Sequence, residues 1–186
     1  NLFRRGWELS TGLRLEEKRQ SLYADLFLPP YDSGYRDSFG ALYDLSDISG
    51  LKTTNTAIGM TRSKYRGNIE TGLTLRFQHE KLEPSGLPET SLTALTLNWM
   101  WTRRAVDDVM DPRRGYVLRT ELGGGTKTLL SDQNFLRSYT RASWYRPMRD
   151  TDTLILRGEF GATLAPSREG IPQDFLFRTG GSQSVR

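Results

Sequence analysis

Apolar and polar residues alternate with a period of two along most of this chain. The clearest stretch covers residues 69–78, where the odd positions carry Ile, Thr, Leu, Leu and Phe and the even positions carry Glu, Gly, Thr, Arg and Gln. Because successive side chains of a β-strand point to opposite faces, this pattern predicts a strand with one apolar and one hydrophilic face. The same alternation recurs in residues 7–15, 22–28, 37–46, 53–63, 91–103, 115–124, 135–147 and 153–164.

Turn-forming residues separate these segments and fall where each predicted strand stops. They are Pro29-Pro30, Ser49-Gly50, Arg66-Gly67, Pro84-Ser85-Gly86, Asp111-Pro112, Ser131-Asp132 and Asp150-Thr151-Asp152. No apolar stripe with helical spacing persists for three turns. The chain is therefore predicted to be all-β, an antiparallel meander of about nine strands with little helix. Segment 53–63 is the weakest strand, because Ile58 and Met60 are its only large apolar residues and Arg62 continues their face.

The two faces of the predicted sheet differ in a way that bears on its surroundings. The hydrophilic face carries charges of both signs, and the apolar face ends in aromatic residues: Trp7, Phe77, Trp99, Trp101, Tyr116, Trp144 and Phe160. Aromatic girdles beside an aliphatic band are typical of a transmembrane β-barrel. A soluble β-sandwich, with the same aromatics in its core, is the alternative. For the barrel we expect Leu73, Leu75, Leu97 and Trp99 on the outer face and Glu70, Arg76 and Arg119 on the inner face.

Composition narrows the class of protein further. The chain has 186 residues, of which 36% are hydrophobic and 26% charged, and it has no cysteine. No apolar run approaches the roughly 18 residues of a membrane-spanning helix, which excludes a helical membrane protein. The missing cysteines exclude a disulfide scaffold and a thiolate metal site. The net charge of +4 is dispersed, with acidic residues between the basic ones, so nucleic acid is not an expected partner.

Candidates for catalysis are few. His79 is the only histidine, and it is expected at a strand end; a site of several histidines is impossible, and no Gly-x-Ser-x-Gly elbow accompanies it. The neighbouring carboxylates Asp107 and Asp108 are better explained as solvated charges in a turn. Gly123-Gly124-Gly125 opens no helix, so it is better explained by close packing than by phosphate binding. We expect a protein that is not an enzyme and has no cofactor or metal.

The last residues break the alternation and carry a motif. Gly180-Gly181-Ser182 is followed closely by Val185-Arg186. This resembles the sixth extracellular loop of the outer-membrane assembly barrels, the bacterial surface antigen family of BamA, TamA and the FhaC-type secretion pores. In that family a Gly-Gly-Ser segment precedes a Val/Ile-Arg-Gly-Phe/Tyr tip. The chain stops after the arginine, so half of the tip is present.

Two other segments strengthen the resemblance and occur in the family's order. Residues 1–6 read Asn-Leu-Phe-Arg-Arg-Gly, similar to an Asn-Leu-Phe-Gly-x-Gly turn, with Arg4 where the family has glycine. A second segment resembles the family's Asp-Pro-x-x-Gly turn, which precedes a mid-barrel strand. It reads Asp111-Pro112-Arg113-Arg114-Gly115-Tyr116, and the residues that match the family's turn are Asp111, Pro112 and Gly115. The segment Asp-Phe-Leu-Phe-Arg at residues 174–178 is more similar to the corresponding segment of TamA than to that of BamA.

The resemblance implies an architecture. Residues 1–186 would be one fragment, about the third to eleventh strands, of a sixteen-stranded transmembrane β-barrel. Residues 165–186 would begin the long loop that folds back into the lumen, where Arg186 would dock on acidic residues of later strands. The POTRA domains would lie outside this chain.

The resemblance also implies a function without covalent chemistry. The protein would insert or translocate β-barrel and autotransporter proteins at the outer membrane of a Gram-negative bacterium. Its partners would be outer-membrane lipid and lipopolysaccharide, unfolded outer-membrane protein clients, and a periplasm-spanning TamB-like subunit. A passive pore or two-partner secretion transporter of the same superfamily is one alternative, and a soluble β-sandwich binding module is another.

Overall fold

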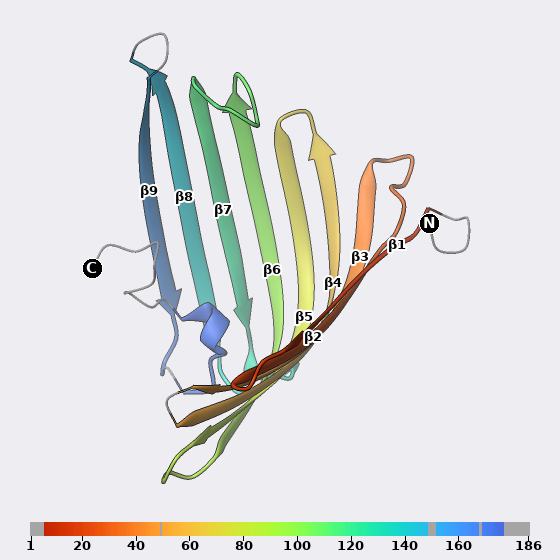
Figure 1. Cartoon of the computed structure of the whole chain (residues 1–186), viewed down its shortest axis with the longest axis vertical. Coiled ribbons are helices and arrows are strands. Elements are labelled where there is room, and N and C mark those ends of the chain that lie inside the picture. The colour runs from red at the N-terminus through yellow and green to blue at the C-terminus, as the bar shows by residue number, and fades with distance from the viewer. Residues whose placement is uncertain (1–5, 49, 149–151, 168, 177–186) are drawn as a thin grey trace.

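A single antiparallel sheet contains all the strands that the structure describes. The computed structural model describes residues 6–48, 50–148, 152–167 and 169–176. The strands follow one another in sequence order across the sheet (Figure 1). They are β1 (Glu8–Leu15), β2 (Arg19–Phe27), β3 (Tyr35–Ile48), β4 (Leu51–Arg66), β5 (Ile69–Pro84), β6 (Thr90–Val106), β7 (Gly115–Gly125), β8 (Phe135–Pro147) and β9 (Thr153–Leu164). The prediction of an all-β antiparallel meander is confirmed.

Helical structure in the described residues is limited to two 3₁₀ turns, η1 (Lys127–Leu129) and η2 (Gln173–Phe175). No helix among these residues has the length and apolar character needed to cross a membrane. A β-sandwich requires two sheets packed face to face. The described residues form one sheet, so the sandwich alternative has no support in the fold.

Central strands are longer than the alternation alone predicted. β5 continues beyond the clearest alternation, which covers residues 69–78, pairs with β6 as far as the Leu82–Thr90 register and ends at Pro84, where the predicted turn begins. β4, the weakest strand by sequence, spans 16 residues and pairs along its whole length with β3 and β5. Two neighbouring ladders satisfy its backbone groups, so this strand does not depend on a strong apolar pattern of its own.

The register fixes the two faces of the sheet. Leu73 lies opposite Trp99 and Leu75 opposite Leu97, and all four side chains are exposed on the outer face. On the opposite face, Thr102 pairs with both Glu70 and Arg119. The assignment of residues to outer and inner faces follows the predicted two-residue period, because a slip of one residue would exchange the faces.

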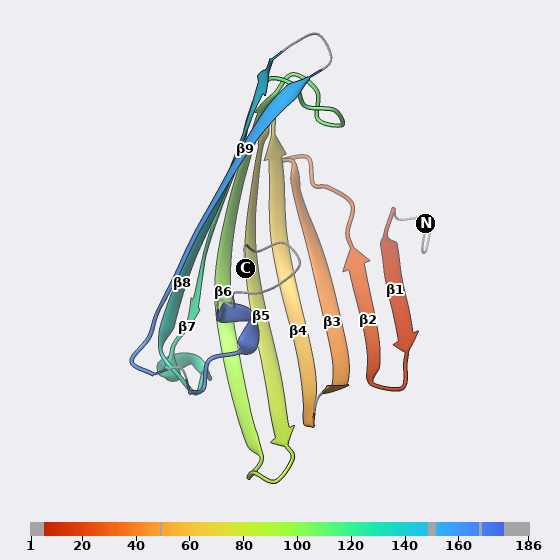
Figure 2. The same cartoon turned by 60° about the vertical axis from the view of Figure 1, so that its left-hand side comes forward.

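The sheet is curved, and its inner face is concave (Figures 1 and 2). The upper rim in Figure 1 holds the connections after β2, β4, β6 and β8, and the lower rim holds those after β1, β3, β5 and β7. After β9 the chain turns back, and η2 lies against the concave face near the lower rim. A small apolar core forms there from Phe135, Ile171 and Phe175, with Leu176 packed against it.

Candidate functional site: the charged concave face

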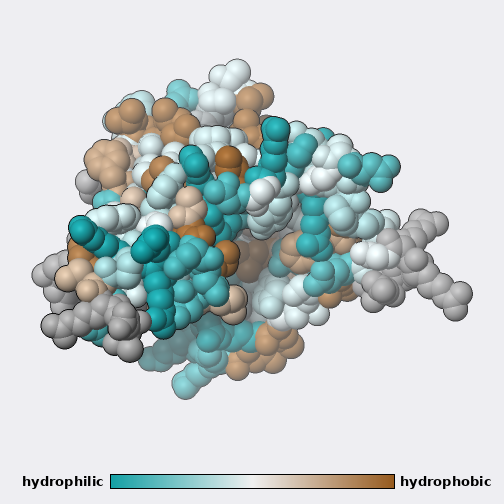
Figure 3. Space-filling view, turned by 90° about the horizontal axis from the view of Figure 1, so that it is seen from above, coloured by the Kyte–Doolittle hydropathy of each residue, from teal (hydrophilic) through white to brown (hydrophobic). Residues whose placement is uncertain are grey.

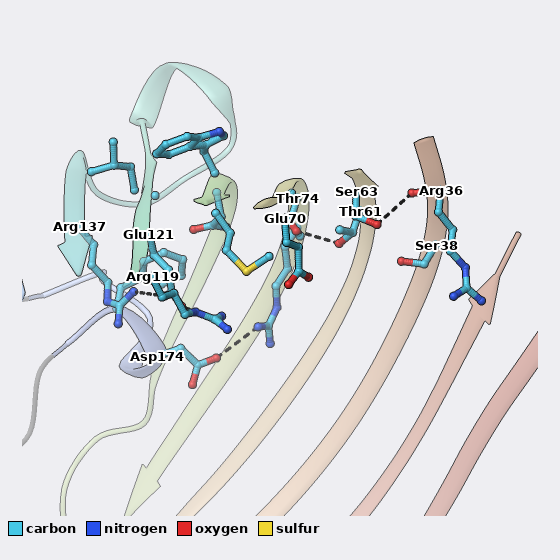
Figure 4. Close-up of a pocket in the computed structure, with 18 of the residues that line it drawn as sticks. Arg36, Ser38, Thr61, Ser63, Glu70, Thr74, Arg119, Glu121, Arg137 and Asp174 are labelled. Carbon is cyan, nitrogen blue, oxygen red and sulfur yellow. Dashed lines mark hydrogen bonds and ion pairs between the residues drawn. The ribbon is translucent and has the colours of Figure 1, made fainter. Parts of the chain in front are cut away.

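The concave face contains a cavity of about 520 Å³. Side chains of β2 to β8 and of η2 line it, and Figure 4 shows basic, acidic and hydroxyl groups pointing into it. Seen from above in Figure 3, the molecule is hollowed and hydrophilic side chains gather around the hollow. The site is therefore a polar interior surface that a curved sheet presents on one side.

Arginines and carboxylates alternate around this cavity and pair with one another. Glu121 accepts from two arginines, Arg119 Nε at 2.7 Å and Arg137 Nη1 at 3.2 Å. Glu70 accepts from Arg104 Nη1 at 2.8 Å and from the Tyr65 hydroxyl at 2.8 Å. Pairs that remain in contact with water contribute about 1 kcal/mol or less each. Their arrangement favours a hydrated, charge-balanced surface over a catalytic centre.

Residues 171–175 cover the lower part of the concave face. Phe175 meets Phe135 edge to face, with ring centroids 4.9 Å apart, and Ile171 is 3% exposed. Glycine at position 123 makes room for this packing, because a Cβ there would collide with the Asn98 side chain and come within 3.4 Å of the Phe175 ring. The close-packing interpretation of the three consecutive glycines thus has a structural basis.

Polar contacts anchor the covering segment at several points. The Gln173 amide donates to Glu80 Oε2 at 3.2 Å, and Glu80 is 3% exposed. Asp174 lies 3.5 Å from Arg76 Nη1, the contact drawn in Figure 4. Thr163 Oγ1 donates to the Phe175 carbonyl at 2.7 Å. The segment is therefore tied to β5 and β9, which are far apart in the sequence.

The predicted turn motif lies at the upper rim, between β6 and β7. Asp111 pairs with Arg113 Nε at 3.2 Å, and Pro112 follows in the same turn. Gly115 begins β7 with φ +116°, and a Cβ at this position would collide with the Ala105 carbonyl. Glycine is thus needed here for conformational and steric reasons.

Asp107 organises this turn, a role that the sequence analysis missed. Its Oδ1 accepts from the amides of Asp108, Arg113 and Arg114, each at 3.0 Å. These backbone hydrogen bonds, led by the one from Arg114, hold the pKa of the Asp107 carboxyl below its ordinary value, against the opposing effect of desolvation. The signal available in the sequence was an Asp placed directly after a strand, where it can bind amides of its own turn.

The residues of the predicted loop motif lie outside the described residues. They are Gly180, Gly181, Ser182, Val185 and Arg186. Arg4 lies outside the described residues as well. Their roles, and the assignment of residues 165–186 to a lumenal loop, stay predictions.

His79 lies within β5, which continues to Pro84, so its expected position at a strand end was wrong. Its Nδ1 lies 3.0 Å from Thr93 Oγ1. Within the described part of the chain, no cluster of three or more histidine and carboxylate side chains is placed to hold a metal ion.

Comparison with known proteins places this fold. The Omp85 superfamily domain matches residues 1–186, the whole sequence. The chain belongs to the Omp85 superfamily. No curated protein matches it significantly. Among solved structures it resembles BamA from Haemophilus ducreyi lacking POTRA domains 1-3, with a TM-score of 0.82 and 16% sequence identity. That match covers 98% of this chain and 40% of the BamA chain, so the meander corresponds to a part of the larger protein.

Proposed function

We propose that this Omp85 chain forms part of the wall of a transmembrane β-barrel in the outer membrane of a Gram-negative bacterium. The observation that carries the proposal is the contrast between the faces. Large apolar side chains such as Leu97 (54% exposed) and Phe160 (69% exposed) cover the outer face, whereas the inner face carries ion pairs. An apolar exterior around a charged interior is the arrangement that suits lipid outside and water inside.

The proposed barrel has sixteen strands, of which β1 to β9 are about the third to the eleventh. The lateral edges of the described sheet, β1 and β9, each pair with one neighbour. Unpaired backbone groups in lipid cost several kcal/mol, so we infer that further strands of the full-length protein continue both edges.

The proposed activity is the insertion or translocation of outer-membrane proteins. A barrel whose closing seam is weak offers unpaired backbone groups to an incoming strand, and the penalty for such groups in lipid draws a client hairpin to the seam. Superfamily membership and the BamA-like fold support this activity.

A TamA-like role is the finer proposal. The amino-acid sequence of residues 174–178 supports this role. The role adds autotransporter clients and a TamB-like subunit to the proposed partners. Unfolded outer-membrane proteins, lipid and lipopolysaccharide complete the proposed set of partners.

A passive pore or a two-partner secretion transporter is the second candidate, and the polar cavity favours it, because a hydrated lumen can also conduct solutes. The covering of the concave face by Ile171 and Phe175 favours the assembly factor instead, because it narrows the interior.

The test uses the full-length protein that contains this chain, reconstituted in lipid vesicles. An unfolded β-barrel client is added, and its folded fraction is followed by the heat-modifiable mobility of the band in gels. We expect faster client folding than in protein-free vesicles. A protein that leaves client folding unchanged but makes the vesicles permeable to sugars would be a passive pore.

A further inference from the structure

Three basic side chains project outward at the upper rim, each over an aromatic ring. They come from the ends of alternate strands: Lys64 of β4, Arg103 of β6 and Arg146 of β8. Their charged groups lie 4.4 Å from the ring centroid of Tyr35, 5.6 Å from that of Tyr116 and 6.0 Å from that of Trp144, respectively. We call Lys64, Arg103 and Arg146 the basic belt.

The positive charges of the basic belt are not neutralised by carboxylates of the protein. Within the described residues, no member of the belt forms an ion pair. Asp37, the acidic residue among the described outward strand positions at this rim, is held by Arg62 through contacts of 2.7 and 2.8 Å. In the neighbouring turn, Asp107 is engaged by backbone amides and Asp111 by Arg113. The belt therefore keeps its positive charge available to a ligand.

The lower rim of the outer face is arranged differently. Lys81 lies 2.8 Å from both Glu83 and Glu89, and Lys52 lies 3.4 Å from Glu83. These lysines already have carboxylate partners on the protein. The two rims thus differ in charge compensation, although strands of the same sheet end at both.

The chemistry of the belt suits a phosphate held beside an apolar surface. Guanidinium and ammonium groups donate charge-assisted hydrogen bonds to phosphate oxygens. Tyrosine and tryptophan prefer the level of lipid headgroups, where one end of the ring is apolar and the other wet. Apolar outer positions adjoin the belt, such as Leu156, which is 51% exposed and pairs with Trp144. A lipid would bury this apolar surface with its acyl chains, whereas free phosphate would not.

We propose that the basic belt binds the headgroup phosphates of anionic phospholipids. This inference rests on the proposed membrane location. It agrees with the orientation that the resemblance implies, in which the segment after β9 begins an extracellular loop at the lower rim and the upper rim lies at the opposite, phospholipid leaflet.

The experiment measures lipid binding by the full-length protein in detergent, using native mass spectrometry with added phosphatidylglycerol or phosphatidylcholine. The test variant carries Lys64→Gln, Arg103→Gln and Arg146→Gln. A basic residue near an anionic surface changes the binding affinity about fivefold. This variant should therefore bind phosphatidylglycerol about 100-fold more weakly, whereas its binding of phosphatidylcholine should not change. The variant Lys64→Arg, Arg103→Lys, Arg146→Lys keeps the charges and should retain binding.

A matched control removes the same charge from cations that already have partners. Arg19 pairs with Asp44 at 3.1 Å, so the control variant is Arg19→Gln, Lys52→Gln and Lys81→Gln, and it should bind phosphatidylglycerol as the wild type does. Equal losses of phosphatidylglycerol in both variants, or equal losses of phosphatidylglycerol and phosphatidylcholine in the test variant, would overturn the proposal.

Insertion separates this inference from the proposed function. Wild-type protein that does not insert into phosphatidylcholine vesicles, judged by heat-modifiable mobility, would refute the membrane location on which the lipid site rests. Protein that inserts normally but shows no preference for phosphatidylglycerol would refute the lipid site alone.

Discussion

The two halves of the concave face share one backbone pattern but have different environments. Near the lower rim, the inward side chains of Gln78, Leu92 and Ala94 are at most 5% exposed. Toward the upper rim, the inward arginine Arg119 is 45% exposed and paired to Glu121 in the cavity. We call these the covered half and the open half. The inward orientation of a side chain on a curved sheet does not by itself determine whether the side chain contacts water. Its exposure depends on whether residues 171–175 cover it.

Residue choice follows this difference. The covered half contains alanine, leucine and glycine at inward positions, which a fully hydrated lumen would not require. It also holds the buried side chain of Gln78, whose amide nitrogen and oxygen have no hydrogen-bond partner among the described residues; an unsatisfied buried group costs about 1–3 kcal/mol. The open half tolerates a dense set of charges because each pair remains in contact with water.

The largest expected effect comes from removing the ring at the centre of the covered half. Phe175→Ala in the full-length protein should cost about 3–5 kcal/mol, because it leaves a cavity against Phe135. Denaturant titration followed by gel mobility would measure the loss, and limited proteolysis would show whether residues 169–176 are released. Phe160→Ala, an outer-face control with a 69% exposed ring, opens no internal cavity and should cost much less. Equal costs would remove the distinction between the halves.

A side chain added under the cover should have the next largest effect. Gly123→Val would collide with Asn98 and press on Phe175, which should destabilise the protein by about 1–3 kcal/mol. Gly158→Val is the matched control, because among the described residues, its two chain neighbours aside, no atom lies within 4 Å of the Cβ that it would add. The same denaturant titration compares the two variants, and a tolerated valine at position 123 would show that the cover is loose.

The polar anchor of the cover should contribute less. Glu80→Gln replaces a charged acceptor of the Gln173 amide by a neutral one, which should weaken the anchor by about 1 kcal/mol. Hydrogen exchange of the Gln173 amide should rise about fivefold, the equivalent of that free energy. Unchanged exchange would mean that the apolar contacts alone hold the segment.

Acidification should weaken the turn between β6 and β7 at the upper rim, because it protonates the Asp107 carboxylate. Its pKa is lower in the folded turn than in the unfolded chain, so its contribution is present at neutral pH and is lost as the pH falls through the folded pKa. Exchange of the Arg113 and Arg114 amides, corrected for its intrinsic pH dependence, should therefore rise on acidification. Asp107→Ala should show the raised exchange already at neutral pH, whereas Asp32→Ala in the connection after β2 should not. Identical exchange in both variants would contradict the assignment.

The smallest effect is expected in the open half. Arg119→Gln breaks one contact of Glu121, which still accepts from Arg137 at 3.2 Å, so the loss should be about 1 kcal/mol or less. Denaturant midpoints in low and high salt would check this value. A loss comparable to that of Phe175→Ala would show that the open half is dry.

The sequence by itself determined the strands and their faces. The period of two at residues 69–78 and 91–103 placed Leu75 and Leu97 on one face and Arg76 on the other, because the pleat permits no other arrangement once a register is set. The positions of the turns could be predicted from the sequence for a similar reason, since glycine and proline determine which backbone conformations are available locally.

Tertiary structure decided which inward positions are covered and what Asp107 binds. Gln78 and Arg76 are neighbouring inward positions of β5 with the same local pattern, yet Gln78 is fully buried and Arg76 is only partly so. Burial depends on residues distant in the sequence, such as Phe175 on Phe135 and Gln173 on Glu80. Alternation reports the direction of a side chain from its own strand, whereas its environment is set by whatever the folded chain brings to that face.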